Sequence, residues 1–241
     1  MLVSILIPCY NEKNTIEKLI IKVKKQKKIK KQIILVDDGS SDGTSKIIKS
    51  KLKKKVDKVI FHKKNLGKGS AIISAIKFIK GDIVIIQDAD LEYEPSDYQK
   101  LLQPFKNKST NVVYGSRVLG RKKSINKFTF EKKFRIFGNF VLTKISNIIN
   151  NQDLTDVHTC YKLIRKKLFL KLQLEEKNFS FCSEVTTKLS KLGENIIEIP
   201  IKYNGRSYHD GKKIGLKDAI LTVITILKYR FLFSIKKKNK N

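Results

Sequence analysis

Residues 85–95 read IIQDADLEYEP, an apolar run that ends in four acidic side chains within seven residues. The chain around them is strongly basic, with a formal net charge of +30. In regular strand geometry Asp88 and Asp90 point to the same side, and without a cation they would repel and raise each other's pKa. Carboxylate oxygens with open water positions suit Mg²⁺ or Mn²⁺. The stretch therefore predicts a metal site on Asp88 and Asp90, with Glu92 as a candidate third ligand; a solvated acidic turn is the alternative.

Strands and helices alternate along the first half of the chain. Apolar, β-branched runs predict strands, and apolar residues at helical spacing predict the helices between them. This alternation indicates an α/β fold with a mostly parallel sheet covered by helices on both faces, as in Rossmann-like folds. The expected strands are residues 2–7, 33–36, 58–62, 83–87, 111–114 and 196–201, and the expected helices are 14–28, 45–52, 68–80 (ended by Gly81), and 96–106.

Ligands of such sheets bind beyond the carboxyl ends of the strands. The loops at residues 8–12, 37–44 and 88–92 all follow predicted strands, so we expect them to converge. Asp42 is expected to cap the next helix. Residues 65–70, NLGKGS, open a further helix, where backbone N–H groups and Lys68 are placed to approach a phosphate; a plain helix start is the equal alternative.

Two helical segments rich in large apolar residues, 130–149 and 215–233, occupy the second half. Neither has the roughly 20 uninterrupted apolar residues of a membrane span. They are either core-facing helices or amphipathic helices in a membrane interface. The nine-residue apolar run 219–227, followed by a basic aromatic stretch and a Lys-rich tail, favours the interface. We therefore expect a catalytic domain over residues 1–214 and an amphipathic helix with a basic tail over 215–241.

The charge arises from 52 Lys and Arg against 22 Asp and Glu. A residue bias spread over solvated faces explains most of it, and an anionic partner such as membrane lipid, a phosphorylated substrate or nucleic acid is the sharper interpretation. Cys9, Cys160 and Cys182 are too few and too widely spaced for a metal cluster or a disulfide framework, which favours a reducing compartment. No signal peptide is expected at the N-terminus.

Several segments, in this order and spacing, carry a resemblance to a known family. ILIPCYNE, ILVDDGSSDGT, NLGKGSAI and IIQDADLEYEP together resemble a family 2 glycosyltransferase of the GT-A fold. The later segments VYGSR, LTDVHTCYKLIRKKL and FSFCSEVTTKLSKLGENIIEIPIKYNGRSYHDGKKI are similar to the branch that includes dolichol-phosphate mannosyltransferase and bacterial polyprenyl-phosphate glycosyltransferases. The match runs from residue 2 to about residue 215.

The resemblance implies an inverting, metal-dependent transfer from a nucleotide diphosphate sugar to a polyprenyl phosphate, with Mg²⁺ or Mn²⁺ as cofactor. It implies roles for nucleotide contacts, metal ligands and phosphate-binding cations. The nucleotide-sugar contacts would be Pro8, Tyr10, Glu12, Asp37, Lys68 and Asp88, the metal ligands Asp88, Asp90 and Glu92, the catalytic residues Asp88, Asp90, Arg117 and Arg206, and the donor or acceptor phosphate contacts Arg117, Arg206, Lys212 and Lys213.

The chain departs from the family at a few positions. Many relatives have Gly where Cys160 stands, an acid where His158 stands, and an aromatic residue where Leu216 stands. Glu92 often corresponds to Gln. The first two positions lie on the expected acceptor side, so the sugar and the acceptor stay open.

Two other functions are compatible with parts of the sequence. A glycosyltransferase acting on a saccharide or other hydroxyl in cell-surface polysaccharide synthesis would need a general base, for which Asp156 or Glu184 are candidates; structural roles for both are equally favoured. A basic nucleic-acid-binding protein would use the charge, but Arg is scarce and no binding module is recognised, so no nucleic-acid partner is expected. With a lipid acceptor, we expect the protein in the cytoplasm, peripherally associated with the cytoplasmic face of a membrane.

Overall fold

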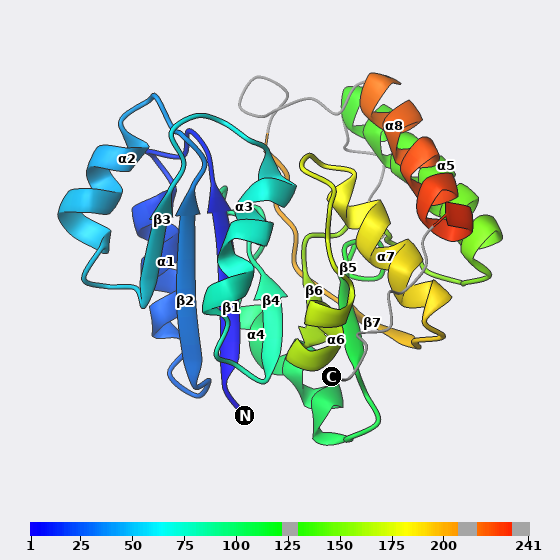
Figure 1. Ribbon diagram of the computed structural model, residues 1–241, viewed down its shortest axis with the longest axis horizontal. Helices are drawn as coiled ribbons and strands as arrows, with labels where there is room; N and C mark the ends of the chain where they lie inside the picture. The colour runs from blue at the N-terminus through cyan, green and yellow to red at the C-terminus, as the bar shows by residue number, and fades with distance from the viewer. Residues whose placement is uncertain (122–129, 207–215, 233–241) are drawn as a thin grey trace, which may run out of the picture.

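A seven-stranded sheet forms the centre of the computed structural model, which describes residues 1–121, 130–206 and 216–232 (Figure 1). The strand order is β3-β2-β1-β4-β6-β5-β7. Within the described residues only β6 runs against its neighbours, so the sheet is mostly parallel, as predicted. The strands are β1 (Val3–Cys9), β2 (Lys31–Asp37), β3 (Lys58–Phe61), β4 (Ile83–Ile86), β5 (Val112–Ser116), β6 (Lys162–Arg165) and β7 (Ile196–Pro200).

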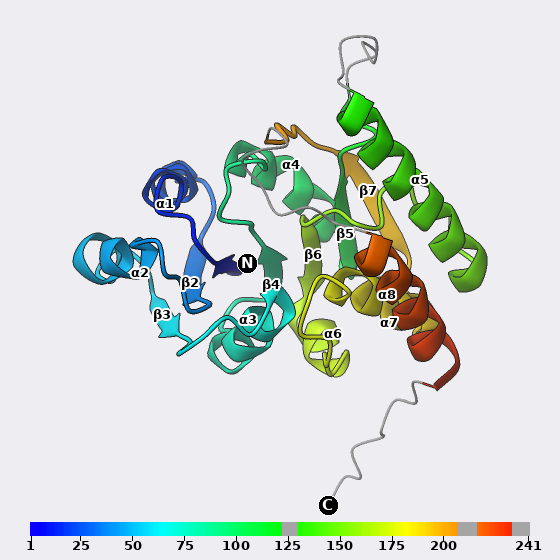
Figure 2. The ribbon, with the colours of Figure 1, turned by 90° about the horizontal axis from the view of Figure 1, so that it is seen from above.

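Helices cover both faces of this sheet. Seen from above, α1 and α4 lie on one face and α3 and α6 on the other (Figure 2). The helices are α1 (Ile16–Lys25), α2 (Thr44–Ile47), α3 (Lys68–Ala75), α4 (Tyr98–Leu102), α5 (Phe130–Asn150), α6 (Lys166–Lys171), α7 (Phe181–Lys191) and α8 (Leu216–Leu227). Short turns extend them: η1 (Ile48–Leu52) after α2, η2 (Ile76–Phe78) after α3, η3 (Pro95–Asp97) and η4 (Gln103–Lys106) on either side of α4, and η6 (Lys228–Leu232) after α8.

The central strands are buried because both of their faces are covered. In β1 the side chains from Val3 to Ile7 are each at most 2% exposed, which explains why the strand is apolar on both faces apart from Ser4, whose hydroxyl donates to Gln32. The register sets Cys9 opposite Asp37 and Leu6 opposite Ile86. The ends of β1, β2 and β4 therefore reach the same edge of the sheet, where the polar loops begin.

The structure corrects some predicted boundaries. The predicted helix 68–80 ends as α3 and η2 at Phe78, and Gly81 is not a left-handed helix cap. A Cβ on Gly81 would lie 2.5 Å from the backbone nitrogen of Ser4, so close packing explains this glycine. The antiparallel strand β6 was not predicted, because its four residues, KLIR, carry no alternation that distinguishes them from the helix that follows.

α7 packs on the face of β5 and β6, and α5 and α8 pack against it, side by side in both views (Figures 1 and 2). Each of the two outer helices keeps an apolar face exposed. Among the described residues, none of the helices has the length and apolar content needed to traverse a bilayer. The exposed apolar side chains are Phe137, Phe140, Val141 and Ile148 on α5, and Ile220, Leu221, Ile224 and Leu227 on α8, continued by Phe231 and Leu232 on η6.

Candidate active site

The loops that follow β1 and β2 meet, as the strand order predicts. The backbone N–H of Asn11 donates to the Ser40 hydroxyl at 2.9 Å, and Ser41 donates back to the Asn11 side chain. The backbone N–H of Glu12 donates to Thr44 at 2.8 Å. The expected convergence of these loops is confirmed, and it sets Glu12 at the shared edge of the sheet.

Acidic side chains shape the loop after β2. The N-cap residue of α2 is Gly43 rather than the predicted Asp42, but Asp42, one residue earlier, still accepts from the backbone N–H of Thr44, the first residue of α2, at 2.9 Å. Asp37 is buried, and its carboxylate accepts from the Ser40 backbone and the Ser45 hydroxyl. The Asp37 carboxylate, which is expected to contact the nucleotide, is therefore already hydrogen-bonded to residues that follow it in the chain.

Asp38 fixes the loop that leads to Lys68. Its two oxygens accept from the backbone N–H groups of Leu66 at 3.0 Å and Gly67 at 2.8 Å. His62 Nδ1 lies 2.6 Å from the same carboxylate. This role of Asp38 was not predicted, although Asp38 is the second acid of the DDGSSDGT segment.

Asp88 and Asp90 lie in a turn rather than in a strand. β4 ends at Ile86, and Leu91 closes the turn with a positive φ of 65°. The premise that Asp88 and Asp90 have regular strand geometry is therefore wrong. Gln87 anchors the start of the turn, because its amide oxygen accepts from the hydroxyls of Tyr98 at 2.5 Å and Tyr161 at 2.7 Å.

Lys68 reaches Asp88 across the sheet edge. Its Nζ lies 2.5 Å from Asp88 Oδ1, and both side chains are largely buried. Burial, the largest single influence, lowers the pKa of Lys68, but the charge of Asp88, its hydrogen bond and the nearby Cys160 and Cys182 together raise that pKa well above its usual value. Lys68 therefore stays charged and neutralises Asp88. The NLGKG segment thus places a cation at the acids, which goes beyond a plain helix start.

Asp90 and Glu92 continue the acidic cluster. Burial first, and then the charges of Asp88 and Glu92, raise the pKa of Asp90 to about 7. Glu92 has both oxygens engaged: Tyr203 donates its hydroxyl at 2.6 Å, and the backbone N–H of Arg206 donates at 2.8 Å. The cluster thus carries more negative charge than its local partners balance.

Arg206 bridges the ends of β1 and β4. Its Nη2 lies 2.5 Å from Glu12 Oε2, and its Nε donates to the backbone oxygen of Asp90 at 3.2 Å. Burial lowers and these acids raise the pKa of Arg206, with a net rise. A residue 194 positions from Glu12 in sequence therefore completes the site.

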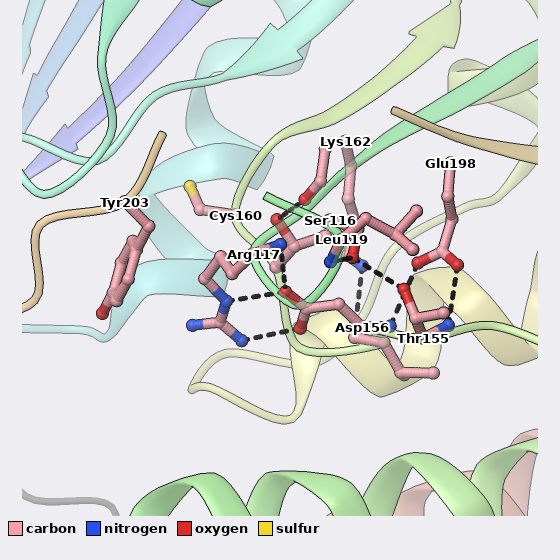
Figure 3. A network of polar contacts seen from close by, with 12 residues as sticks. Ser116, Arg117, Leu119, Thr155, Asp156, Cys160, Lys162, Glu198 and Tyr203 are labelled. Atoms are coloured by element: carbon pink, nitrogen blue, oxygen red, sulfur yellow. Dashed lines mark hydrogen bonds and ion pairs between the residues drawn. The ribbon is translucent and has the colours of Figure 1, made fainter. Parts of the chain in front are cut away.

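Arg117 makes a second cationic centre, held in a different way. Figure 3 shows its guanidinium bound through two parallel hydrogen bonds to Asp156, each 2.7 Å long, while its backbone N–H donates to the same carboxylate at 2.9 Å. The Arg117 Cζ lies 5.2 Å from the ring centre of Tyr203. Because the Tyr203 hydroxyl binds Glu92, this ring connects the Arg117 centre to the acidic cluster.

The donor set fits a divalent cation only in part. Asp88 and Asp90 supply hard oxygen ligands whose mutual repulsion a cation would relieve. Glu92 fits less well, because Tyr203 and Arg206 occupy its oxygens. No three His, Cys, Asp or Glu side chains in the described ranges come together as a ready-made ion site. We therefore expect Asp88 and Asp90 to hold the metal.

The other predicted site residues fall in three places. Pro8 is half-buried at the end of β1, and Tyr10 is 44% exposed beside it, which leaves its ring open to solvent. Lys212 and Lys213 lie outside the described residues, as does the tail beyond residue 232. His158 and Cys160 both border the site: Cys160 Sγ lies 3.6 Å from Lys68 Nζ.

Asp156 and Glu184, the two candidate bases, have structural partners. Burial would raise the pKa of Asp156, but Arg117 lowers it below the usual range, so the carboxylate stays ionised and accepts a proton poorly. Glu184 is fully buried against Lys188 at 2.6 Å. Tyr203 is a site residue that was not predicted, although it lies three residues before Arg206 in the sequence.

A cavity of about 450 Å³ lies away from these acids, next to β3 and the end of α3. His62 and Ser74 line it, and His62 Nε2 lies 2.9 Å from the Ser74 hydroxyl. The polar groups of His62 are thus already satisfied by Asp38 and Ser74. The chemistry gathers at the sheet edge instead.

Comparison with known proteins agrees with this geometry. The chain belongs to glycosyl transferase family 2, whose model matches residues 4–173, and it is a glycosyltransferase. This sets aside the nucleic-acid-binding alternative. The fold is likewise that of the GT-A glycosyltransferases.

Two relatives and one solved structure show which glycosyltransferases the chain is similar to. A UDP-N-acetylglucosamine–dolichyl-phosphate N-acetylglucosaminyltransferase from Methanococcus voltae is 32% identical over 219 residues, covering 83% of this chain and 85% of the relative. A dolichol-phosphate mannosyltransferase from Pyrococcus furiosus is 30% identical over 216 residues, covering 89% of this chain and 60% of the relative. Glucosyl-3-phosphoglycerate synthase from Mycobacterium tuberculosis, solved with Mn²⁺ and UDP-glucose, has a TM-score of 0.68 at 16% identity and covers 97% of this chain and 80% of its own. The predicted resemblance to the polyprenyl-phosphate branch is confirmed.

Proposed function

We propose that this glycosyltransferase moves a sugar from a nucleoside diphosphate sugar to a polyprenyl phosphate, with inversion at the sugar. The observation that carries the proposal is the Arg117 centre. Asp156 fixes this guanidinium through two hydrogen bonds, and Nη1 makes no hydrogen bond within the described residues. A fixed, always charged fork beside the acidic cluster suits an anionic acceptor.

The acceptor phosphate supports a mechanism without a general base. Its oxygen is already anionic at neutral pH, so it attacks the anomeric carbon directly, on the face opposite the departing nucleotide. Asp156 is bound to Arg117 and Glu184 to Lys188, which leaves neither of them placed to accept a proton. A hydroxyl acceptor would need such a base, so the phosphate acceptor is the better match to these residues.

The donor end is formed by the converging loops. Pro8, Tyr10, Glu12 and Asp37 lie at the ends of β1 and β2, where a nucleoside would bind, with the exposed Tyr10 ring available for stacking. Lys68 and Arg206 bring positive charge to the diphosphate side. A divalent ion, Mg²⁺ or Mn²⁺, held by Asp88 and Asp90 would stabilise the negative charge that develops on the departing diphosphate.

A lipid acceptor requires the site to work next to a membrane. The exposed apolar faces of α5 and α8 lie side by side, and Arg135, Lys144 and Lys217 on these helices supply positive charge. Apolar insertion and attraction to anionic lipid then act together, at about 1 kcal/mol for each cation near the surface. We place the protein peripherally on the cytoplasmic face of a membrane, where unpaired cysteines such as its three are stable.

The experiment that tests the function is a donor and acceptor screen. Radiolabelled nucleotide sugars are supplied with polyprenyl phosphate or with soluble saccharides, and the lipid extract is counted. We expect label in the lipid with one donor and none in the saccharides. Label that moves only to a saccharide would replace the proposal with the hydroxyl-acceptor alternative.

Membrane binding needs its own variant, because deleting the C-terminal helix would uncover α7, against which Ile226 and Tyr229 are buried. Replacing the exposed Ile220, Ile224 and Phe231 with Gln leaves those buried contacts in place. We expect the variant to pellet less with anionic vesicles than the wild-type protein does, and high salt to release part of the wild-type protein. Unchanged pelleting would rule out α8 as the anchor.

A further inference from the structure

A buried ion pair on α7 holds the chain segment that precedes this helix. Glu184 and Lys188 are both fully buried, with their charged groups 2.6 Å apart. The two oxygens of Glu184 also accept from the backbone N–H groups of Glu175 at 2.8 Å and Glu176 at 2.9 Å. A carboxylate with three partners is satisfied inside the protein, so residues 175–178, here called the clamp segment, have a fixed backbone.

The C-terminal helix holds the same segment from the other side. The Tyr229 hydroxyl lies 2.9 Å from a carboxylate oxygen of Glu176 and 3.2 Å from one of Glu175. Lys228 Nζ lies 2.9 Å from the same Glu176 oxygen. Tyr229 is 2% exposed, whereas the neighbouring Phe231 is 72% exposed, so η6 has one face on the clamp segment and another toward solvent.

The clamp segment touches the first turn of α3, where Lys68 lies. The backbone N–H of Ser70 donates to the Lys177 carbonyl at 3.1 Å. A Cβ on Gly69 would lie 1.9 Å from the Glu176 carbonyl oxygen, and one on Gly67 would lie 2.4 Å from that of Lys177. Both glycines therefore allow backbone to pack directly on backbone, and a shift of the clamp segment moves the turn that aims Lys68 at Asp88.

We infer that Tyr229 is a positioning residue for the donor site: through Glu175 and Glu176 it fixes the clamp segment, and the clamp segment fixes Lys68 against Asp88. This inference rests on the proposed function of Lys68 and Asp88 in donor binding. It assigns the C-terminal helix a second task besides membrane contact, since the same short turn, η6, carries both the exposed apolar side chains and the buried hydroxyl.

Nucleotide binding without lipid separates this task from membrane anchoring. The full-length protein is titrated with UDP and with GDP, each with Mn²⁺, in a calorimeter. We expect Tyr229→Phe to weaken the better-bound nucleotide about fivefold, within the range by which remote contacts modulate binding. Lys228 is half-exposed and contacts the same Glu176 oxygen, so Lys228→Met should also weaken nucleotide binding, but by a smaller factor. It decides the test should Tyr229→Phe fail to fold.

Tyr114→Phe is the matched control. The Tyr114 hydroxyl is also buried and lies 3.0 Å from Thr186 on α7, but it does not contact the clamp segment. We expect a similar loss of thermal stability with nucleotide affinity unchanged within about twofold. Equal affinity in Tyr229→Phe and wild type, or an equal loss in Tyr114→Phe, would overturn the inference. A wild-type protein that binds neither nucleotide would overturn the proposed function itself.

With an active wild type, a kinetic measurement repeats the test on the reaction. On a short, soluble acceptor analogue, Tyr229→Phe should raise KM for the donor sugar nucleotide about fivefold and change kcat little. A merely structural role would lower the amount of active enzyme and leave KM unchanged. That outcome would also overturn the inference.

Discussion

Arg117 and Arg206 are the two arginines at the site, and they are held in opposite ways. Arg117 has a carboxylate partner of its own, Asp156, with two hydrogen bonds to the guanidinium and one to its backbone. Arg206 is held by Glu12 and by the backbone of Asp90, within the acids proposed for nucleotide and metal. Arg117 is therefore a preset anion site, while the contacts of Arg206 change when the acidic cluster changes.

The difference indicates a division of labour. A guanidinium that is fixed in advance loses little freedom when an anion binds, which suits recognition of the acceptor phosphate. A guanidinium that shares its partners with the metal site responds to the donor and suits the developing charge of the leaving diphosphate.

Replacing Asp90 with Ala should remove activity, by at least about 100-fold, without unfolding the chain. Asp90 is placed to hold the metal, and Ala retains the backbone oxygen to which Arg206 Nε donates, as well as leaving the Arg206–Glu12 pair intact. Activity and the circular dichroism spectrum are measured together. Wild-type turnover that persists in a chelator, with metal removal verified, would contradict the metal assignment.

Arg206→Ala should slow sugar transfer by about 30- to 100-fold, while the affinity for free nucleotide should fall by less than about threefold. The reason is that Arg206 is assigned to charge that develops during the reaction. Single-turnover rates and nucleotide titration give the two quantities. Equal losses in both would make Arg206 a simple donor anchor and remove the contrast with Arg117.

Arg117→Lys should raise KM for the lipid about tenfold, because a lysine cannot reproduce the two parallel bonds to Asp156.

Arg206→Lys should retain more activity than Arg206→Ala, since it preserves the charge opposite Glu12.

Asp156→Asn provides the sharper control for Arg117. It should raise KM for the lipid through a loosened Arg117 and leave the pH profile of kcat unchanged. Loss of the acidic limb, the fall in kcat at low pH, would identify Asp156 as a general base instead.

His158→Phe should reduce the pH dependence of stability. Burial, followed by the charge of Lys162 and that of Arg117, lowers the pKa of His158 to about 4, although Asp156 acts in the opposite direction. A depressed folded-state pKa means that this contribution is fully present above pH 6.5 and is lost as the pH falls toward 4. Between these values we expect wild type to lose about 2.5 kcal/mol more unfolding free energy than the variant. Urea titrations of both proteins at the two pH values measure this difference. An equal change in unfolding free energy with pH in wild type and variant would contradict the assignment.

The acids at the ends of β1 and β4 could be predicted from the sequence because local signals place them. An apolar run that ends in acids marks a strand end, and parallel strands bring their ends to one edge. Glu12, Asp88 and Asp90 gather there for this reason. Lys68 follows from the glycine-flanked helix start in the same way.

The partners that complete the site could not be predicted from such signals. Tyr203 lies 111 residues from Glu92, and Arg117 lies 39 from Asp156, so only the fold brings them together. The turn at Asp88 depends on the buried Gln87 and on the positive φ of Leu91, which an apolar residue seldom adopts. The antiparallel β6, four residues long, carried no readable pattern.

The most direct test of the central claim compares two lipids that differ in one group. Polyprenyl phosphate and the matching polyprenol are supplied at equal concentration in the same vesicles, with the donor found in the screen and Mn²⁺. We expect sugar transfer to the phosphate alone, because Arg117 is set for an anion and neither Asp156 nor Glu184 is placed to deprotonate a hydroxyl. Transfer to polyprenol at a comparable rate would contradict the claim that this site works on a phosphate acceptor without a general base.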